Sequence, residues 1–140
     1  MKHIFLDTNV VIDFLADRRP FSVDAAQLFD LAIQGKIKIY ISAVSYNNIY
    51  YILRQSLTSN TTIKLLDELA GMTEIADVTK EVIRQSLKSD FKDYEDAIQY
   101  YCALNISEID LIVTRNTKDF KKSELAVLTT TEAIASLKIA

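Results

Sequence analysis

A short apolar run, His3-Ile4-Phe5-Leu6, is followed at once by the polar residues Asp7-Thr8-Asn9. This pattern is typical of a buried β-strand that carries a polar group at its carboxyl end. From Val10 to Ala16 the apolar residues take the spacing of a short helix, so the strand should lead directly into that helix. We therefore expect Asp7 to lie at the tip of a buried strand.

The same alternation of short apolar runs and helical patterns continues along the chain. Further strands are predicted at residues 37–41, 72–76, 111–114 and 126–128. Helices are predicted at residues 22–34, 47–53, 61–70, 79–87, 94–104 and 131–137. We expect Ser22 to cap the first of these helices, Ser42 or Ser45 to cap the second, and Gly35 and Gly71 to follow helix ends.

Short strands separated by helices specify an α/β fold, here a three-layer α/β/α sandwich with a mainly parallel central sheet of about four to five strands. A chain of 140 residues fits one domain, so residues 1–140 are expected to form one unit without a linker. A carboxylate already stands at position 7, and no apolar run is long enough to span a membrane. We expect a soluble cytoplasmic protein.

The overall charge lacks the basic excess that is typical of nucleic-acid-binding proteins. The formal net charge is −3 and the isoelectric point is about 5.1, which leaves only a local basic patch for such binding. An acidic total also suits a domain whose carboxylates gather to hold cations.

Polar residues that follow strands are the main site candidates, because ligands of parallel sheets bind beyond the carboxyl ends of the strands. Asp7 follows the first strand, and residues 114–119 follow the fourth. Asp93 and Asp96 stand three apart at a helix start and can face the same way, while Glu95 between them is expected to point elsewhere. Each acid alone could be a helix cap or a turn residue, but a strand tip is a poor place for a carboxylate unless a positive charge meets it there.

Magnesium is the natural cation for such a group, because it prefers oxygen ligands and keeps several of its waters. A bound Mg²⁺ activates water and neutralises charge on a phosphate, so the pattern predicts phosphodiester hydrolysis without a covalent intermediate. The only histidine, His3, is expected just before the first strand at an edge, which disfavours a histidine triad. The chain also contains no glycine-rich phosphate loop.

Sequence fragments in a particular order carry a family resemblance. They are Phe5–Val11 (FLDTNVV), Ile41–Ile49 (ISAVSYNNI), Tyr94–Gln99 (YEDAIQ) and Ile112–Phe120 (IVTRNTKDF). In order and spacing they resemble the motifs of the PIN-domain nucleases, in particular the small VapC-like toxins of the virulence-associated type C kind. The resemblance extends over essentially the whole chain and implies a PIN-like fold.

The resemblance also implies site residues. Asp7 and Asp96 match the first and third metal-binding acids of the family, and residues 114–119 match the segment that supplies the fourth. Asn48 stands where the family usually has a glutamate, and Asn116 stands where a fourth aspartate is common. A neutral amide lowers metal affinity, so we expect one Mg²⁺, or Mn²⁺ in its place. The acids that could compensate are Asp93, Glu95 and Asp119.

Neighbouring polar side chains are expected to support these acids or the substrate. Thr8 and Asn9 can hydrogen-bond Asp7 or a bound water, or cap the helix that follows. Residues expected to act as orienting groups or neutral ligands are Asn48, Thr114 and Asn116. Those expected to contact RNA phosphates are Arg115 and Lys118. The resemblance further implies an RNA substrate, a homodimer and a cognate antitoxin protein.

Several functions remain open from the sequence. One is a metal-dependent endoribonuclease, the toxin of a type II toxin–antitoxin pair. Another is a catalytically weakened PIN module that binds RNA or a protein partner without cleavage, as Asn48 and Asn116 suggest. A third is a phosphotransfer enzyme with Asp7 as nucleophile, but that chemistry wants an aspartate two residues later, where Asn9 stands.

Overall fold

A parallel sheet forms the centre of the computed structural model, which describes residues 1–139, with side chains described through residue 138. Its strands are β1 Lys2–Leu6, β2 Ile37–Ser42, β3 Glu74–Ala76, β4 Leu111–Val113 and β5 Ala126–Leu128. They lie in the order β3-β2-β1-β4-β5, and each neighbouring pair is parallel. The chain passes from β1 to β2 and β3 on one side of the sheet and then to β4 and β5 on the other side. Strand β1 is therefore the central strand.

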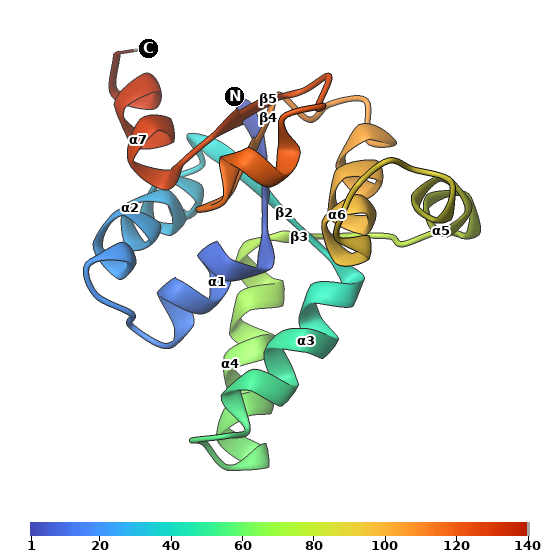
Figure 1. The fold of residues 1–140 in the computed structure, drawn as a ribbon. Helices are drawn as coiled ribbons and strands as arrows, with labels where there is room; N and C mark the ends of the chain where they lie inside the picture. Colours follow the sequence, from blue (N-terminus) through green and yellow to red (C-terminus); the bar gives the residue numbers. More distant parts are fainter. Residues whose placement is uncertain (140) are drawn as a thin grey trace.

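Helices cover both faces of this sheet (Figure 1). They are α1 Thr8–Leu15, α2 Phe21–Ile33, α3 Ala43–Leu53, α4 Ser59–Met72, α5 Lys80–Leu87, α6 Tyr94–Leu104 and α7 Thr130–Ile139, with a 3₁₀ helix η1 at Thr117–Phe120. Helices α1, α2, α3, α4 and α7 pack on one face, and α5, α6 and η1 pack on the other. The predicted α/β sandwich with a parallel sheet is confirmed.

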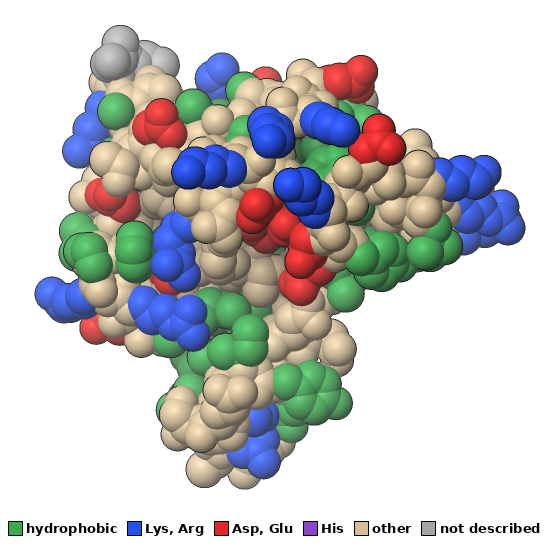
Figure 2. Space-filling view, viewed as in Figure 1, with side chains coloured by type: hydrophobic (Ala, Val, Ile, Leu, Met, Phe, Trp, Pro, Cys, Tyr) green, Lys and Arg blue, Asp and Glu red, His purple; other side chains and the backbone are tan. Residues whose placement is uncertain are grey.

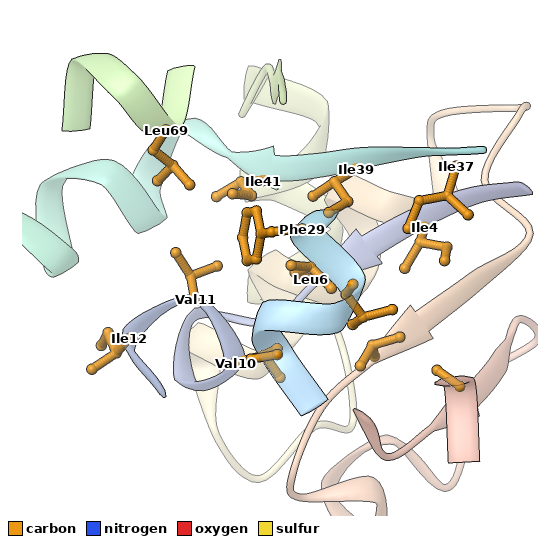
Figure 3. Packing of buried hydrophobic residues seen from close by; sticks show 14 of the residues in the cluster. Ile4, Leu6, Val10, Val11, Ile12, Phe29, Ile37, Ile39, Ile41 and Leu69 are labelled. Atoms are coloured by element: carbon orange, nitrogen blue, oxygen red, sulfur yellow. The ribbon is translucent and has the colours of Figure 1, made fainter. Parts of the chain in front are cut away.

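Alternating side chains of the strands form the two halves of the core. Ile4 and Leu6 of β1 face the cluster that includes Phe29 of α2, shown in Figure 3. Phe5, between them, faces the opposite cluster with Ile98 of α6. Because successive side chains of a strand point to opposite faces, a stretch buried on both faces must be apolar throughout, as Ile4, Phe5 and Leu6 of β1 are.

Most helix ends lie where local residues predict them. The Ser42 hydroxyl caps α3 by accepting a hydrogen bond from the Ser45 backbone N–H at 3.2 Å, and Gly35, with φ +76°, follows the end of α2. The predicted Ser22 cap is wrong: α2 begins at Phe21, and the Ser22 N–H donates to the Arg18 carbonyl at 2.8 Å. Ser22 is therefore already inside the helix, which begins after Pro20 without a side-chain cap.

Two further boundaries differ from the predictions. Helix α4 continues through Gly71 to Met72, and β3 begins only at Glu74, because a single glycine weakens a helix without ending it.

His3 lies inside β1, where its Nδ1 is 2.8 Å from the Tyr40 hydroxyl oxygen. The strand separates it from Asp7 by roughly 13 Å, so it cannot act at the same centre. Within the described range, no helix has both the length and the apolarity to cross a membrane.

Candidate active site

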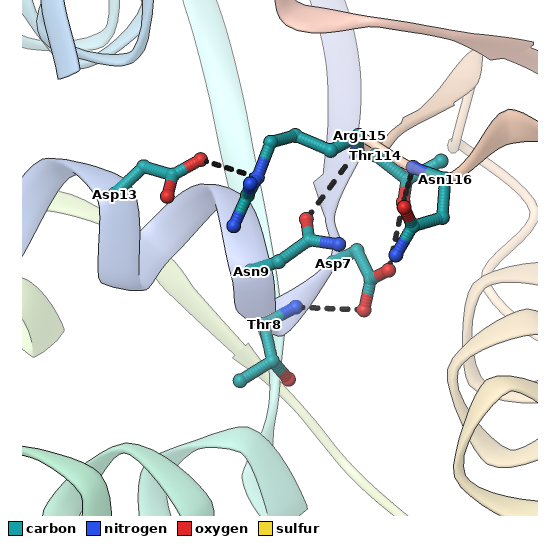
Figure 4. Close-up of polar contacts among 7 residues, drawn as sticks. All are labelled: Asp7, Thr8, Asn9, Asp13, Thr114, Arg115 and Asn116. Atoms are coloured by element: carbon teal, nitrogen blue, oxygen red, sulfur yellow. Dashed lines mark hydrogen bonds and ion pairs between the residues drawn. The ribbon is translucent and has the colours of Figure 1, made fainter. Parts of the chain in front are cut away.

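The Asp7 carboxylate is buried directly after the central strand, with only 7% of the residue exposed. Its backbone N–H donates to the Val113 carbonyl at 3.0 Å, which keeps it attached to β4. Oδ1 accepts a hydrogen bond from the Thr8 backbone N–H, and Oδ2 accepts one from the Thr114 hydroxyl, each at 2.8 Å (Figure 4). Asp7 thus caps α1 and at the same time holds a fixed carboxylate at the sheet edge.

The Thr114 hydroxyl connects Asp7 to the segment that follows β4. It accepts a hydrogen bond from the Asn116 backbone N–H at 3.1 Å while it donates to Asp7. The Thr114 backbone N–H in turn donates to the Leu128 carbonyl of β5 at 3.0 Å. Main-chain pairing on one side and a hydroxyl bridge on the other therefore fix the position of this segment relative to Asp7.

A buried polar network lies beneath Asp7 and joins the starts of α1 and α3 to α6. The hydroxyl oxygens of Thr8 and Ser45 are 2.7 Å apart, and those of Ser42 and Ser45 are 2.9 Å apart. The Gln99 amide donates to Ser45 at 2.9 Å and to Thr8 at 3.2 Å. Sequence reasoning missed Gln99 as a site residue, although a polar amide on the apolar face of a helix was a usable signal.

Further acids line a cleft beside Asp7 that has a volume of about 260 Å³. Asp93 caps α6, its Oδ1 accepting a hydrogen bond from the Asp96 backbone N–H at 3.1 Å. Figure 2 shows acidic side chains gathered in a hollow of this face with basic side chains around them. The charged residues that line the cleft are Asp90, Lys92, Asp93, Asp96, Lys118, Asp119, Lys121 and Lys122.

The charges of these acids oppose one another. Burial, followed by the negative charges of Asp7 and the other acids, raises the pKa of Asp96 to about 7. Burial also raises the pKa of Asp7; the hydrogen bonds from Thr114 and Thr8 lower it in part, and the charges of Glu95 and Asp119 raise it again. Among the described side chains, Asp90 at the cleft rim pairs with Lys122 at 3.7 Å, but no ion pair neutralises Asp7, Asp96 or Asp119. The site therefore lacks a positive charge at its centre.

The donor chemistry fits a hydrated Mg²⁺ or Mn²⁺. No three acidic, histidine or cysteine side chains among the described residues come together as a complete ligand group. Mg²⁺ commonly binds through one or two carboxylates and completes its octahedron with water, so a site of this kind would need no more protein ligands than Asp7 and Asp96. Two unneutralised carboxylates in one half-buried place supply the hard oxygen donors that such a cation requires.

Asn48 and Glu95 meet across the site. The Asn48 side-chain amide of α3 donates to Glu95 Oε1 of α6 at 3.0 Å. Glu95 was expected to point away from Asp93 and Asp96. Its exposed carboxylate is held by Asn48, and its charge contributes to the raised pKa of both Asp7 and Asp96. Asn48 thus holds a carboxylate of α6 near the acids without supplying one itself.

Arg115 is paired rather than free. Its Nε lies 2.9 Å from Asp13 Oδ2, and the Asp13 side chain is only 2% exposed. The Nε–H does not point at this oxygen, so the contact is an ion pair without a hydrogen bond. Its guanidinium carbon stands 4.4 Å from the centre of the Phe21 ring. Asn9, expected beside Asp7, accepts a hydrogen bond from the Arg115 backbone N–H at 3.4 Å (Figure 4). Sequence reasoning missed Asp13, an acid within an apolar helix.

The class of protein is defined by a parallel β-sheet covered by helices, with acids gathered beyond the carboxyl ends of its strands. The family model described as PIN domain matches residues 3–118. The chain belongs to the PIN domain family.

Relatives of known name or structure resemble nearly the whole chain. Ribonuclease VapC1 of Aquifex aeolicus (strain VF5) is 27% identical over 134 residues, which cover 92% of this chain and 91% of that protein. A chain in the structure of FitAB bound to an IR36 DNA fragment has a TM-score of 0.71 at 18% identity, covering 91% of this chain and 94% of its own. A chain of a toxin-antitoxin complex from Klebsiella pneumoniae has a TM-score of 0.66 at 24% identity, covering 91% and 97%. The likeness to the solved structures supports the fold.

The raised pKa of Asp96 predicts a pH-dependent stability. Because the folded protein favours the protonated acid, the unfolded chain ionises first, and Asp96 should lower stability progressively as pH rises from about 4 to 7. We expect Asp96→Asn to raise Tm in chelator at pH 7.5 more than at pH 4.5, measured by thermal melting. Asp67→Asn, on the exposed face of α4, is the control. An equal effect of Asp96→Asn at both pH values would contradict this assignment.

The buried Asp13 carboxylate predicts a second effect on stability. Arg115→Ala leaves that charge without its partner and should reduce the free energy of unfolding by about 3 kcal/mol. Adding Asp13→Asn removes the charge and should recover part of the loss, which urea denaturation measures. Additive losses in the double variant would show that the two side chains do not interact.

Proposed function

We propose that this protein is a divalent-metal-dependent endoribonuclease that hydrolyses RNA phosphodiester bonds. The observation that carries the proposal is the unneutralised group of acids around Asp7 and Asp96 beside a rim of lysines. Membership of the PIN family and the likeness to a protein named Ribonuclease VapC1 support it. The lysine rim can hold the phosphates of a strand whose scissile bond lies over the acids.

Asp7 and Asp96 would hold Mg²⁺, or Mn²⁺ in its place, with water completing the coordination. When bound, the cation supplies activated water and neutralises charge that develops on the phosphate. Asp119 is the better third acid, because its charge acts on both Asp7 and Asp96. Asp93 acts on Asp96 alone and is engaged as the cap of α6, so its role is to fix the start of that helix.

The chain positions these acids through neutral partners. Thr8 and Thr114 hold one oxygen of Asp7 each, which keeps the carboxylate in a single orientation. Asn116 supports Thr114 through its backbone, and Asn48 holds the Glu95 carboxylate through a hydrogen bond. Lys118 lies exposed on the cleft rim beside Asp119, where it can contact the strand.

We further propose that the protein is the toxin of a type II toxin–antitoxin pair, acts as a homodimer and has a cognate antitoxin. Support comes from the fold shared with the Klebsiella pneumoniae toxin-antitoxin complex.

The second candidate function is a module that binds RNA or a protein without cleavage. The lack of a complete three-ligand group among the described residues favours that candidate. A phosphotransfer role ranks last, because both Asp7 oxygens accept hydrogen bonds in a buried place.

Cleavage of RNA tests the main proposal. Purified protein with a pool of structured and unstructured RNAs should cut them in Mg²⁺ or Mn²⁺ and leave them intact in chelator. Asp7→Asn and Asp96→Asn should each reduce the rate by more than about 100-fold, because a direct ligand matters more than an orienting partner. Asp67→Asn should cut like wild type. Intact RNA in every reaction, together with undetectable Mn²⁺ binding, would favour the non-cleaving module.

Metal affinity tests the role of Asn48 and Glu95. Glu95→Gln removes a charge from the centre and should weaken Mn²⁺ binding by about tenfold, measured by calorimetry. Asn48→Ala frees the Glu95 side chain and should produce a smaller loss. Glu68→Gln, exposed on α4, serves as the control. Wild-type affinity in Glu95→Gln would remove Glu95 from the site.

A further inference from the structure

A second cavity, here called the Phe21 cavity, lies across the segment after β4 from the acidic cleft. Its volume is about 430 Å³, within the range of small-molecule sites. The residues that line it are Phe21, Asp24, Arg115, Asn116 and Thr129–Thr131. Residues 115 and 116 line this cavity, whereas Lys118 and Asp119 of the same segment line the acidic cleft. An RNA strand that crosses the segment can therefore reach both places.

One wall of the Phe21 cavity is a stacked pair of flat groups. The Arg115 guanidinium carbon lies 4.4 Å from the centre of the Phe21 ring. The same guanidinium forms an ion pair with Asp13, whose Oδ2 is 2.9 Å from Nε. Phe21 is nevertheless 45% exposed at the start of α2. Aromatic rings and guanidinium planes are the surfaces on which unpaired bases stack.

The cavity also offers hydrogen-bonding groups. Asp24 stands one turn after Phe21 on α2, and its Oδ2 accepts a hydrogen bond from the Thr131 hydroxyl at 2.7 Å. This bond joins α2 to α7 and fixes the carboxylate. The first N–H groups of α7 have no acceptor within their own helix, and Thr129 caps the turn by accepting from the Glu132 N–H at 3.2 Å. The cavity thus combines a fixed acceptor with backbone donors.

We propose that the Phe21 cavity binds an unpaired guanine of the RNA strand, next to the bond that is cut. The inference rests on the proposed nuclease function and names how that site selects its substrate. Guanine presents two adjacent donors, N1–H and the amino group, which a carboxylate can accept together, and two acceptors, O6 and N7, for the donors on α7. Asp24 reads the donor edge, and Phe21 with Arg115 stacks the ring.

A protein ligand fits the cavity less well. The side chain of a partner's arginine is also flat and also carries adjacent donors, so it could pair with Asp24. Asp13 already pairs with Arg115, so charge alone does not separate the two ligands. We assign the cavity to a base because Phe21 and Arg115 offer a flat stacking surface, and because the segment that lines the cavity also lines the acidic cleft where the strand would be cut.

Binding of short RNAs to Asp7→Asn tests the cavity separately from cleavage. Fluorescence anisotropy with labelled UUGUU, UUAUU, UUCUU and UUUUU should show UUGUU binding about tenfold more tightly than the others. Asp24→Asn in that background should remove the preference, and Phe21→Ala should weaken all the RNAs by about tenfold. Val23→Ala and Asp30→Asn, exposed on the same helix but outside the cavity, are the matched controls.

The outcomes separate this inference from the proposed function. Equal binding of all the RNAs, or a guanine preference that survives Asp24→Asn, overturns the guanine subsite even if wild type cleaves RNA. Tighter binding of the peptide acetyl-Gly-Arg-Gly-amide than of UUGUU, lost in Asp24→Asn, overturns it in favour of a protein ligand. A guanine preference that requires Asp24 supports the subsite, and mapped cuts next to guanine in wild type, lost in Asp24→Asn, support it further.

Discussion

The rest of the site depends on the burial of one carboxylate at the end of the central strand. A buried charge is costly unless it is hydrogen-bonded, and Asp7 meets that need with one donor from the backbone of α1 and one from Thr114. The hydroxyl and amide groups behind it, including Ser45 and Gln99, fix the starts of the surrounding helices. The like charge of Asp96 works against this arrangement, so the fold keeps a local destabilisation at the place where we propose that RNA is cut.

Local signals explain how much of the fold could be predicted from the sequence. Apolar runs between helical patterns gave the strands, and the position of Asp7 directly after one of them placed it at the sheet edge. Ser42 and Asp93 cap helices through bonds to residues three positions later, so they too could be predicted. The Ser22 cap failed because the chain already turns before Ser22, whose own N–H donates to the Arg18 carbonyl, so α2 begins at Phe21 with no side-chain cap.

Contacts between distant segments explain what could not be predicted. Asn48 and Glu95 are 47 positions apart, and their hydrogen bond depends on how α3 and α6 pack around the sheet. Arg115 meets Asp13 only because β4 lies beside β1, which brings the segment after β4 against α1. Strand order follows from the pairing of whole elements, whereas the direction of one side chain depends on every neighbour that surrounds it. Thus Asp7, Asp96 and the hydrogen-bonding neighbours Thr8 and Thr114 were accessible from the sequence as candidates, whereas the Asn48–Glu95 and Asp13–Arg115 pairs were not.

The ion pair between Asp13 and Arg115 also holds in place the segment that separates the acidic cleft from the Phe21 cavity. Moving Arg115 away would leave the Asp13 charge buried without a partner, so the segment between the two cavities resists displacement. The Asn116 N–H bonded to Thr114 anchors the same segment from the side of the acids. Such a rigid divider would act as a molecular ruler: the break in the strand would fall at a constant number of nucleotides from the recognised base, whatever the sequence beyond it.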